Sequence, residues 1–306
     1  MEDIVQEIHA PARKNFLRRQ VKILDFHETW QADLVEMSKY ASENRGFKYL
    51  LTIIDIFSKY AFAIPLKSKS GKDVTAAFET ALKTDRKPQN LHVDMGKEFY
   101  NSNFENLLKK YNIHMYSTFS NMKASICERF NRTLKEKMWK LFSLRGNYKW
   151  VDKIADLVSE YNNTVHRTIK MKPNQVTLEN AKQLYNNVYK NRILTVKKKN
   201  KFRIGDHVRI SKYKHVFAKG YTPNWTTEIF VINKVKNTVP ITYELKDYED
   251  NPIKGCFYEQ ELLKTKYPNV YLVEKIIKRR GEQVLVRWKG FSSLHDSWVH
   301  KNDVLK

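Results

Sequence analysis

Three carboxylates in the first half of the chain have the residue types and local settings of a metal centre. Asp33 lies in an extended run, Asp94 ends the short apolar run 91–93, and Glu128 lies in a stretch with helical periodicity. Carboxylate oxygens are the ligands that Mg²⁺ and Mn²⁺ prefer, and phosphoryl transfer on two ions needs them about 3.5–4 Å apart. Three acids drawn together would repel one another unless a cation were bound. We therefore interpret Asp33, Asp94 and Glu128 as candidate catalytic metal ligands.

The order and spacing of these acids resemble the D, D, E pattern of retroviral-type integrases. Sixty residues separate Asp33 from Asp94, and 33 separate Asp94 from Glu128, slightly fewer than is usual in that family. A short loop deletion accounts for the difference. Three further segments resemble family motifs: Met95-Gly-Lys-Glu-Phe99, Glu128-Arg-Phe-Asn-Arg-Thr-Leu-Lys135, and Tyr161-Asn-Asn-Thr-Val-His-Arg-Thr168 followed by Pro173.

The nearest resemblance is to integrases of Maverick/Polinton DNA transposons, followed by chromodomain-bearing retrotransposon integrases, and it covers residues 25–306. It implies a DDE polynucleotidyl transferase that trims DNA 3′ ends and joins them to target DNA with two Mg²⁺ (or Mn²⁺) ions. It also implies double-stranded DNA as partner, a homo-oligomer (dimer or tetramer) and a nuclear location. Such integrases carry a zinc domain of two His and two Cys near the N-terminus. No cysteine precedes Cys127, so we do not expect that domain in this chain.

The elements that must position the acids are typical of an α/β, RNase H-like core over residues 25–190. Residues 49–57 and 61–66 predict a hairpin, and Asp73 is expected to cap a helix over 74–83. The pattern also predicts strands at 91–93 and 113–118, and helices at 103–111 and 150–166. Asp55 matches no catalytic position and is expected to be structural. His166, without a second His or Cys nearby, is expected to cap or to face DNA rather than bind metal.

The helix that carries Glu128 presents a charged face. Steps of four, three and four place Glu128, Arg132, Lys135 and Trp139 on one side. A lone Glu–Arg pair at this spacing is usually a solvated surface ion pair. The resemblance implies instead that Arg132 and Lys135 contact the phosphates of the donor DNA.

The residues on either side of the core are expected to form smaller modules. Residues 1–24 are expected to form a basic N-terminal arm, with Arg13, Lys14, Arg18 and Arg19 near nucleic acid, and 191–201 a basic linker. Five short strands over 202–264 predict a small basic β-barrel, which resembles the SH3-like barrel of integrases. Residues 268–306 resemble a chromodomain, and Tyr271, Trp288 and Phe291 match its cage for methylated lysine on a histone tail. The alternative is that these three rings only fill a core; Val284, Val286 and Trp298 are expected to supply that core.

Composition agrees with a nucleic-acid partner. A net charge of +23 and a pI near 9.7 favour polyanion binding, and 13% aromatic residues argue against a disordered basic tail. Two cysteines permit no disulfide framework, and no apolar run approaches about 18 residues, so no membrane partner is expected. Two alternatives stay open: a catalytically lapsed, domesticated DNA- and chromatin-binding protein, and a plain nuclease of the RNase H type.

Overall fold

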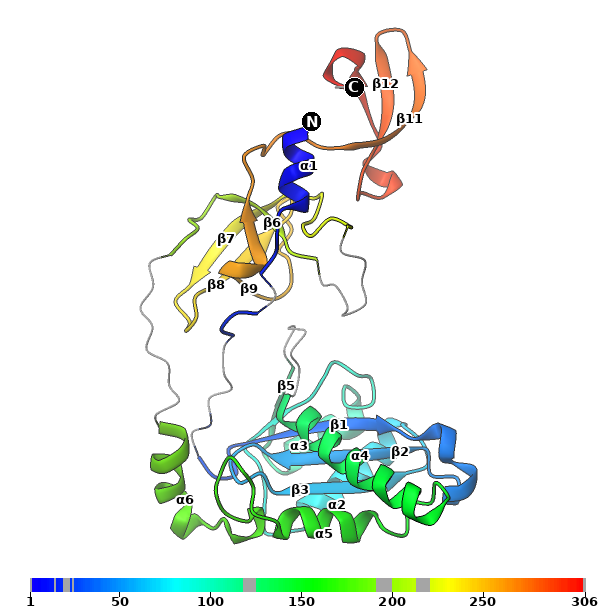
Figure 1. Cartoon of the computed structure of the whole chain (residues 1–306), viewed down its shortest axis with the longest axis vertical. Coiled ribbons are helices and arrows are strands. Elements are labelled where there is room, and N and C mark those ends of the chain that lie inside the picture. Colours follow the sequence, from blue (N-terminus) through cyan, green and yellow to red (C-terminus); the bar gives the residue numbers. More distant parts are fainter. Residues whose placement is uncertain are drawn as a thin grey trace. The chain divides into compact units, whose positions relative to one another are not determined.

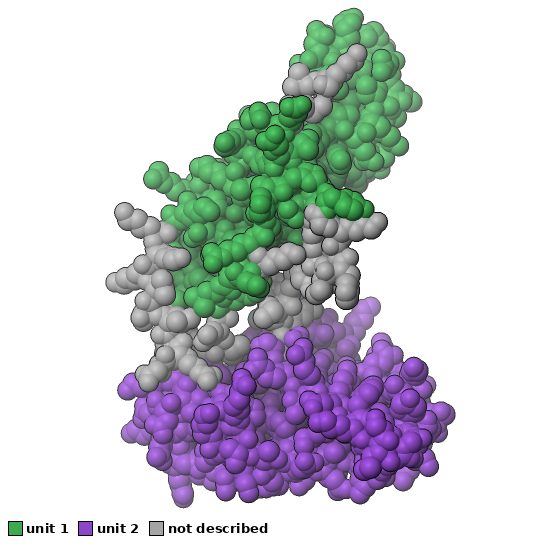
Figure 2. Space-filling view, in the orientation of Figure 1, with its two compact units in different colours: residues 1–20, 195–306 green, residues 21–194 purple. Residues whose placement is uncertain are grey.

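The computed structural model describes residues 2–13, 15–18, 23, 25–117, 125–190, 200–212 and 221–304. The chain forms two compact units, one of residues 21–194 and one that combines residues 1–20 with 195–306 (Figure 2). Each unit is described by itself below. Lys14, Arg19 and the linker over 191–199 lie outside the described residues.

The core unit is built on a mixed five-stranded sheet in the order β3-β2-β1-β4-β5 (Figure 1). Strand β2 is antiparallel to both of its neighbours, whereas β1, β4 and β5 run parallel. The hairpin predicted from the apolar runs is confirmed, because β2 pairs with β3 over its length. The strands are β1 (Thr29–Glu36), β2 (Tyr49–Asp55), β3 (Ala61–Leu66), β4 (Asn90–His92) and β5 (His114–Tyr116).

Helices cover both faces of this sheet. On one face, α2 (Gly71–Leu82) and α3 (Ser102–Lys110) enclose a core that includes Trp30 and Phe78. On the other, α4 (Ser125–Arg145) and α5 (Ile154–Asn163) enclose a second core. Burial on both faces explains why β2 is a nearly continuous apolar run. After α5 in the sequence come a 3₁₀ turn (Pro173–Gln175), α6 (Leu178–Leu184) and a π-helical turn (Tyr185–Tyr189).

Two expected boundaries in the core unit are wrong. Ser70, not Asp73, caps α2: its hydroxyl accepts the Asp73 backbone N–H at 3.2 Å, while the Asp73 carboxylate accepts from the Ser68 hydroxyl. The helix expected over 150–166 begins only at Ile154, after a turn. At α2 a serine side chain takes the backbone donor of the first turn. Before α5, the backbone N–H groups of Trp150 and Val151 donate instead to the Asn44 side-chain oxygen, at 2.7 and 3.2 Å.

The other unit contains two antiparallel sheets. The larger has the order β10-β6-β7-β8-β9 and encloses the buried Phe202, Ile232 and Tyr243. Its strands are β6 (His207–Ile210), β7 (Phe230–Lys236), β8 (Thr242–Lys246), β9 (Phe257–Tyr258) and β10 (Leu262–Lys264). The smaller sheet has the order β11-β12-β13, with β11 (Val273–Arg280), β12 (Gln283–Trp288) and β13 (Ser297–His300). Val284 and Val286 are buried as expected, but Trp298 is 43% exposed, so it does not supply the core of this sheet.

The N-terminal helix α1 (Glu2–His9) packs against the larger of these two sheets. The Glu7 carboxylate accepts from the Arg209 guanidinium at 2.7 Å and from the Thr265 hydroxyl at 2.7 Å. The Trp225 indole N–H donates to the Ala10 carbonyl at 2.8 Å. Both side chains of the Glu7–Arg209 ion pair are almost fully buried. The segment expected to be a basic arm is therefore, over residues 2–10, an integral part of this unit.

None of the helices in the described ranges is long and apolar enough to cross a membrane.

Candidate active site

Asp33 and Asp94 meet through the register of two parallel strands. β1 and β4 pair Thr29 with Asn90 and Gln31 with His92. Asp33 and Asp94 each follow the last of these pairs by two residues, and they lie near enough for the charge of Asp94 to act on Asp33. Because side chains alternate along a strand, Gln31 and Asp33 share one face of β1. That is the face covered by α4. Burial, with a smaller contribution from the charge of Asp94, holds the pKa of Asp33 above its ordinary value.

The start of α4, which carries Glu128, is fixed to β1 by a buried amide. The Gln31 side-chain oxygen accepts the backbone N–H groups of Ile126 (3.1 Å) and Cys127 (3.0 Å). These belong to the first turn, whose N–H groups have no partner within a helix. The Gln31 side-chain nitrogen lies 3.2 Å from His92 Nδ1. Gln31 therefore links the three elements that carry the three acids.

The Asp33 carboxylate is held in one orientation by two donors. Asn131, one turn after Glu128, donates to Oδ2 at 2.8 Å, and the Leu34 backbone N–H donates to Oδ1 at 2.9 Å. Both donors favour the ionised form, as does the charge of Lys135, but burial outweighs them. A cation bound next to Asp33 would therefore further stabilise its ionised form.

The donor set fits a hard divalent cation, although the ligand group is not closed. Within the described ranges, no three His, Cys, Asp or Glu side chains gather closely enough to hold a metal ion. Asp33 and Asp94 converge, whereas Glu128 is exposed on the first turn of α4. Asp33 and Glu128 both lie near enough to the buried Cys127 thiol to add to the effect of burial in raising its pKa. Mutual repulsion of three carboxylates gives a physical reason for the open arrangement.

The expected face of α4 is present. Glu128, Arg132, Lys135 and Trp139 are all exposed. Lys135 is near enough to Asp33 to affect its pKa, and the Trp139 ring contacts Tyr40 edge to face at 6.0 Å. This face therefore places the Lys135 cation beside Asp33.

Two other expectations concern polar groups elsewhere in the core unit. Asp55 is fully buried and accepts from the Phe57 backbone N–H at 2.9 Å and the Ser58 hydroxyl at 2.6 Å, so it shapes the β2–β3 turn as expected. His166 accepts the Thr168 backbone N–H at 3.2 Å, and burial together with nearby cations lowers its pKa to about 4. Neither geometry suggests a metal ligand.

Sequence reasoning missed the residues that position the acids: Gln31, His92 and Asn131. A signal was available for each. Gln31 and His92 stand two residues before Asp33 and Asp94 on the same strand faces, and Asn131 follows Glu128 by three. Polar residues inside otherwise apolar strands are buried only when they are hydrogen-bonded.

In the other unit, the three expected cage residues lie together. The Tyr271 ring contacts Trp288 at 6.1 Å and Phe291 at 5.9 Å between centroids, both edge to face. The Trp288 indole N–H donates to the Ser297 hydroxyl at 2.8 Å, which fixes the orientation of that ring. All three side chains are partly exposed.

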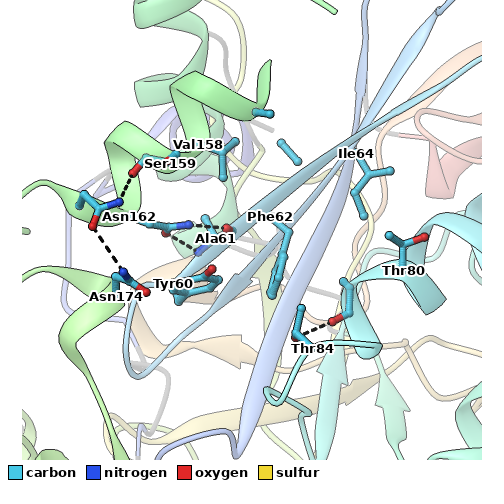
Figure 3. A pocket seen from close by; sticks show the side chains of 14 residues that line it. Tyr60, Ala61, Phe62, Ile64, Thr80, Thr84, Val158, Ser159, Asn162 and Asn174 are labelled. Carbon is cyan, nitrogen blue, oxygen red and sulfur yellow. Dashed lines mark hydrogen bonds between the residues drawn. The ribbon is translucent and has the colours of Figure 1, made fainter. Parts of the chain in front are cut away.

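A separate groove of about 430 Å³ lies on the core unit between β3, α2 and α5 (Figure 3). Its lining contains no Asp, Glu, His, Cys, Lys or Arg, so the groove offers no charged group and no ligand for a metal ion. At its edge the Asn162 amide accepts the Ala61 backbone N–H and donates to the Ala61 carbonyl, each at 2.9 Å. This pairing occupies part of the outer edge of β3.

Comparison with known proteins decides the family. Residues 26–119 match the model of the integrase core domain. The chain is 36% identical over 228 residues to a transposon-derived protein of Caenorhabditis elegans, which covers 74% of this chain and 76% of that protein. The chain belongs to the transposon-derived proteins with an integrase core domain.

Two further matches extend the likeness of this integrase-core protein. The Pol polyprotein of a radiation murine leukemia virus is 30% identical over 125 residues, which span 40% of this chain and 21% of the polyprotein. The structure of the simian T-cell lymphotropic virus intasome superposes with a TM-score of 0.57 at 14% identity, over 85% of this chain and 84% of that one. The mixed sheet with its flanking helices is thus an RNase H-like integrase core fold, as the sequence predicted.

Proposed function

We propose that this integrase-core protein is a metal-dependent DDE polynucleotidyl transferase that processes DNA 3′ ends and joins them to target DNA. One observation carries the proposal: the register of β1 and β4, with α4 attached to both through Gln31, brings the elements that bear Asp33, Asp94 and Glu128 side by side. The family membership supports it independently.

In this proposal Asp33, Asp94 and Glu128 hold two Mg²⁺ or Mn²⁺ ions. Ions in such a site activate the attacking oxygen and stabilise the leaving oxygen of an in-line displacement. The chain itself orients the acids. Asn131 keeps Asp33 Oδ2 fixed, and the buried Gln31 keeps the first turn of α4, with Glu128, against the sheet. Asp33 is thereby preorganised, which reduces the rearrangement needed when metal and substrate bind.

The exposed face of α4 would hold the donor DNA. Arg132 and Lys135 project from the same side as Glu128, one and two turns further along the helix. Contacts from such cations to phosphates fix the register of a duplex without reading its sequence. The net charge of +23 supports tight, salt-dependent DNA binding. Joining two DNA ends requires two active sites, so the proposed assembly is a dimer or tetramer.

The second unit would direct insertion to chromatin. The rings of Tyr271, Trp288 and Phe291 form a cluster suited to a methylated lysine of a histone tail, because a methylated ammonium is attracted to aromatic faces. The larger sheet of this unit would act as an SH3-like barrel and the smaller as a chromodomain. The proposed site of action is the nucleus.

A strand-transfer assay tests the catalytic part. Labelled blunt duplexes are incubated with the full chain and Mg²⁺ or Mn²⁺, beside Glu128→Gln. The matched control is Glu136→Gln, which changes an exposed glutamate of the same helix that is paired with Lys140. We expect joined products for the native chain and the control, and none for Glu128→Gln at unchanged DNA affinity. Full joining by Glu128→Gln would refute the assignment.

A second candidate function is a DNA- and chromatin-binding protein whose catalysis has lapsed. The exposed position of Glu128, outside any closed ligand group of the described residues, favours it. DNA binding by the native chain without joining under either metal, on duplexes carrying its own terminal repeats, would select this alternative.

A further inference from the structure

Tyr248, which follows β8, reaches the rings of the smaller sheet from the larger one. Its ring contacts Phe291 at 5.8 Å and His295 at 5.5 Å between centroids, both edge to face. The hydroxyl lies 2.9 Å from Glu249 Oε1 and 2.5 Å from His295 Nδ1. A phenol has one proton, so if it donates to Glu249 it accepts from His295. These contacts hold both the ring and the hydroxyl of Tyr248 in place.

Four rings consequently form a continuous series, each turned edge to face to the next. From Tyr248 the series runs to Phe291 (74° between planes), Tyr271 (75°) and Trp288 (65°). We infer that Tyr248 is a fourth wall of the methyl-lysine site, supplied by the larger sheet, and that a trimethyllysine side chain binds against all four rings. The inference rests on the proposed cage of Tyr271, Trp288 and Phe291.

The contact between the two sheets is made by backbone as well as by side chains. Gly290, next to Phe291, has a φ of +93°, and a Cβ placed there would lie 2.2 Å from the Thr227 hydroxyl oxygen. Only glycine permits this close approach without strain. The rings therefore come together through a close-fitting junction, and nearly half of Tyr248 (46%) stays exposed for a ligand.

Acidic groups favour a cation at this wall. Burial, the hydrogen bond to Glu249 and the charges of Glu249, Asp247 and Glu228 raise the pKa of Tyr248 to about 12. Burial and the charge of Asp247 also raise the pKa of Glu228. In a chain of net charge +23, acidic groups beside the Tyr248 ring favour the approach of a methylated ammonium to that ring.

Fluorescence anisotropy with the full chain tests the inference. The probes are a labelled peptide with one trimethyllysine between neutral residues and its unmethylated counterpart, at about 150 mM salt to screen the basic surface. Tyr248→Leu keeps apolar bulk but removes the π face, and Tyr248→Phe keeps the face but removes the hydroxyl. Trp288→Ala tests the proposed cage itself. Tyr221→Leu, at a 72% exposed tyrosine of the same unit, is the matched control.

We expect Tyr248→Leu to bind the methylated peptide about three- to thirtyfold more weakly, the range given by loss of one cation–π contact. Tyr248→Phe and Tyr221→Leu should bind within about twofold of the native chain, and all three variants should melt at its temperature. If Trp288→Ala abolishes binding while Tyr248→Leu binds like the native chain, the cage stands and the fourth wall is refuted. If the native chain does not distinguish the two peptides, the cage and the fourth wall both fail.

Discussion

Gln31→Leu should strongly destabilise the core unit, although leucine and glutamine have similar side-chain volumes. Gln31 is fully buried, and its oxygen is the acceptor for two backbone N–H groups at the start of α4. Leucine leaves both groups buried without a partner. Each such loss costs about 1–3 kcal/mol. The extra apolar burial of leucine offsets part of this, so we expect a net loss of about 3 kcal/mol in the free energy of unfolding.

The corresponding change in melting temperature can be measured. For a unit that spans residues 21–194, each kcal/mol shifts the melting temperature by about 2–4 °C, so the core transition should fall by about 6–12 °C. Differential scanning calorimetry of the full chain would read that transition. Hydrogen exchange at Ile126 and Cys127 should accelerate in parallel, because these amides lose their acceptor.

The control for this experiment is Gln31→Glu. Burial on the same strand face as Asp33 favours the neutral form of this glutamate, which keeps a carbonyl oxygen for the two N–H groups and an O–H toward His92 Nδ1. It should therefore lose less than half of what Gln31→Leu loses. A Gln31→Leu chain that melts within about 2 °C of the native chain, with unchanged exchange at Ile126, would show that Gln31 does not hold α4 in place.

Two further predictions follow from the pKa shifts. Because the folded chain raises the pKa of Asp33, stability is lost as the pH rises above the ordinary value of this carboxyl, and at pH 7 an ionised Asp33 destabilises the fold. Asp33→Asn should therefore raise the melting temperature without metal, and Mg²⁺ should stabilise the native chain but not this variant, as a thermal-shift titration would reveal. A native chain that Mg²⁺ leaves unchanged would contradict this. For Glu7, burial alone would raise the pKa, but hydrogen bonds from Arg209, Lys266 and Thr265 outweigh it and lower the pKa below 4.5. The stabilising contribution of Glu7 is therefore complete above pH 4.5 and is lost as the pH falls through the lowered pKa. Glu7→Gln should make the stability of the unit of residues 1–20 and 195–306 less dependent on pH, as acid unfolding would measure. Identical acid-unfolding profiles for the variant and the native chain would contradict this prediction.

The sequence predicts the core well where periodicity and chemistry agree. Asp33 lies within an extended run and Asp94 follows a short apolar strand, and parallel pairing of these strands brings the two acids near each other. The charged face of α4 could be predicted because its residues follow one another at intervals of three and four positions. The Gln31 hydrogen bonds could not be predicted with the same certainty, because they join residues about 95 positions apart and depend on how α4 crosses β1.

The errors have local or long-range physical causes. Ser70 and Asp73 are both good capping residues, and only the actual start of α2 decides between them. Trp298 alternates correctly with its neighbours, yet a three-stranded sheet has too little second layer to cover it. The packing of residues 2–10 against Arg209 and Trp225 has no signal in local sequence at all.

Because α1 packs against residues made much later, this part of the fold can form only late in synthesis. All of residues 21–194 are made between α1 and its partners at Arg209, Trp225 and Thr265. The core unit can fold while the ribosome is still translating, since domains generally fold as units as they emerge. The first helix must wait, with its apolar side unsatisfied, until the far end of the chain arrives. A nascent chain stalled near residue 195 would therefore carry a folded integrase core and an unpartnered α1, a state in which that helix is open to chaperones or to another copy of the chain.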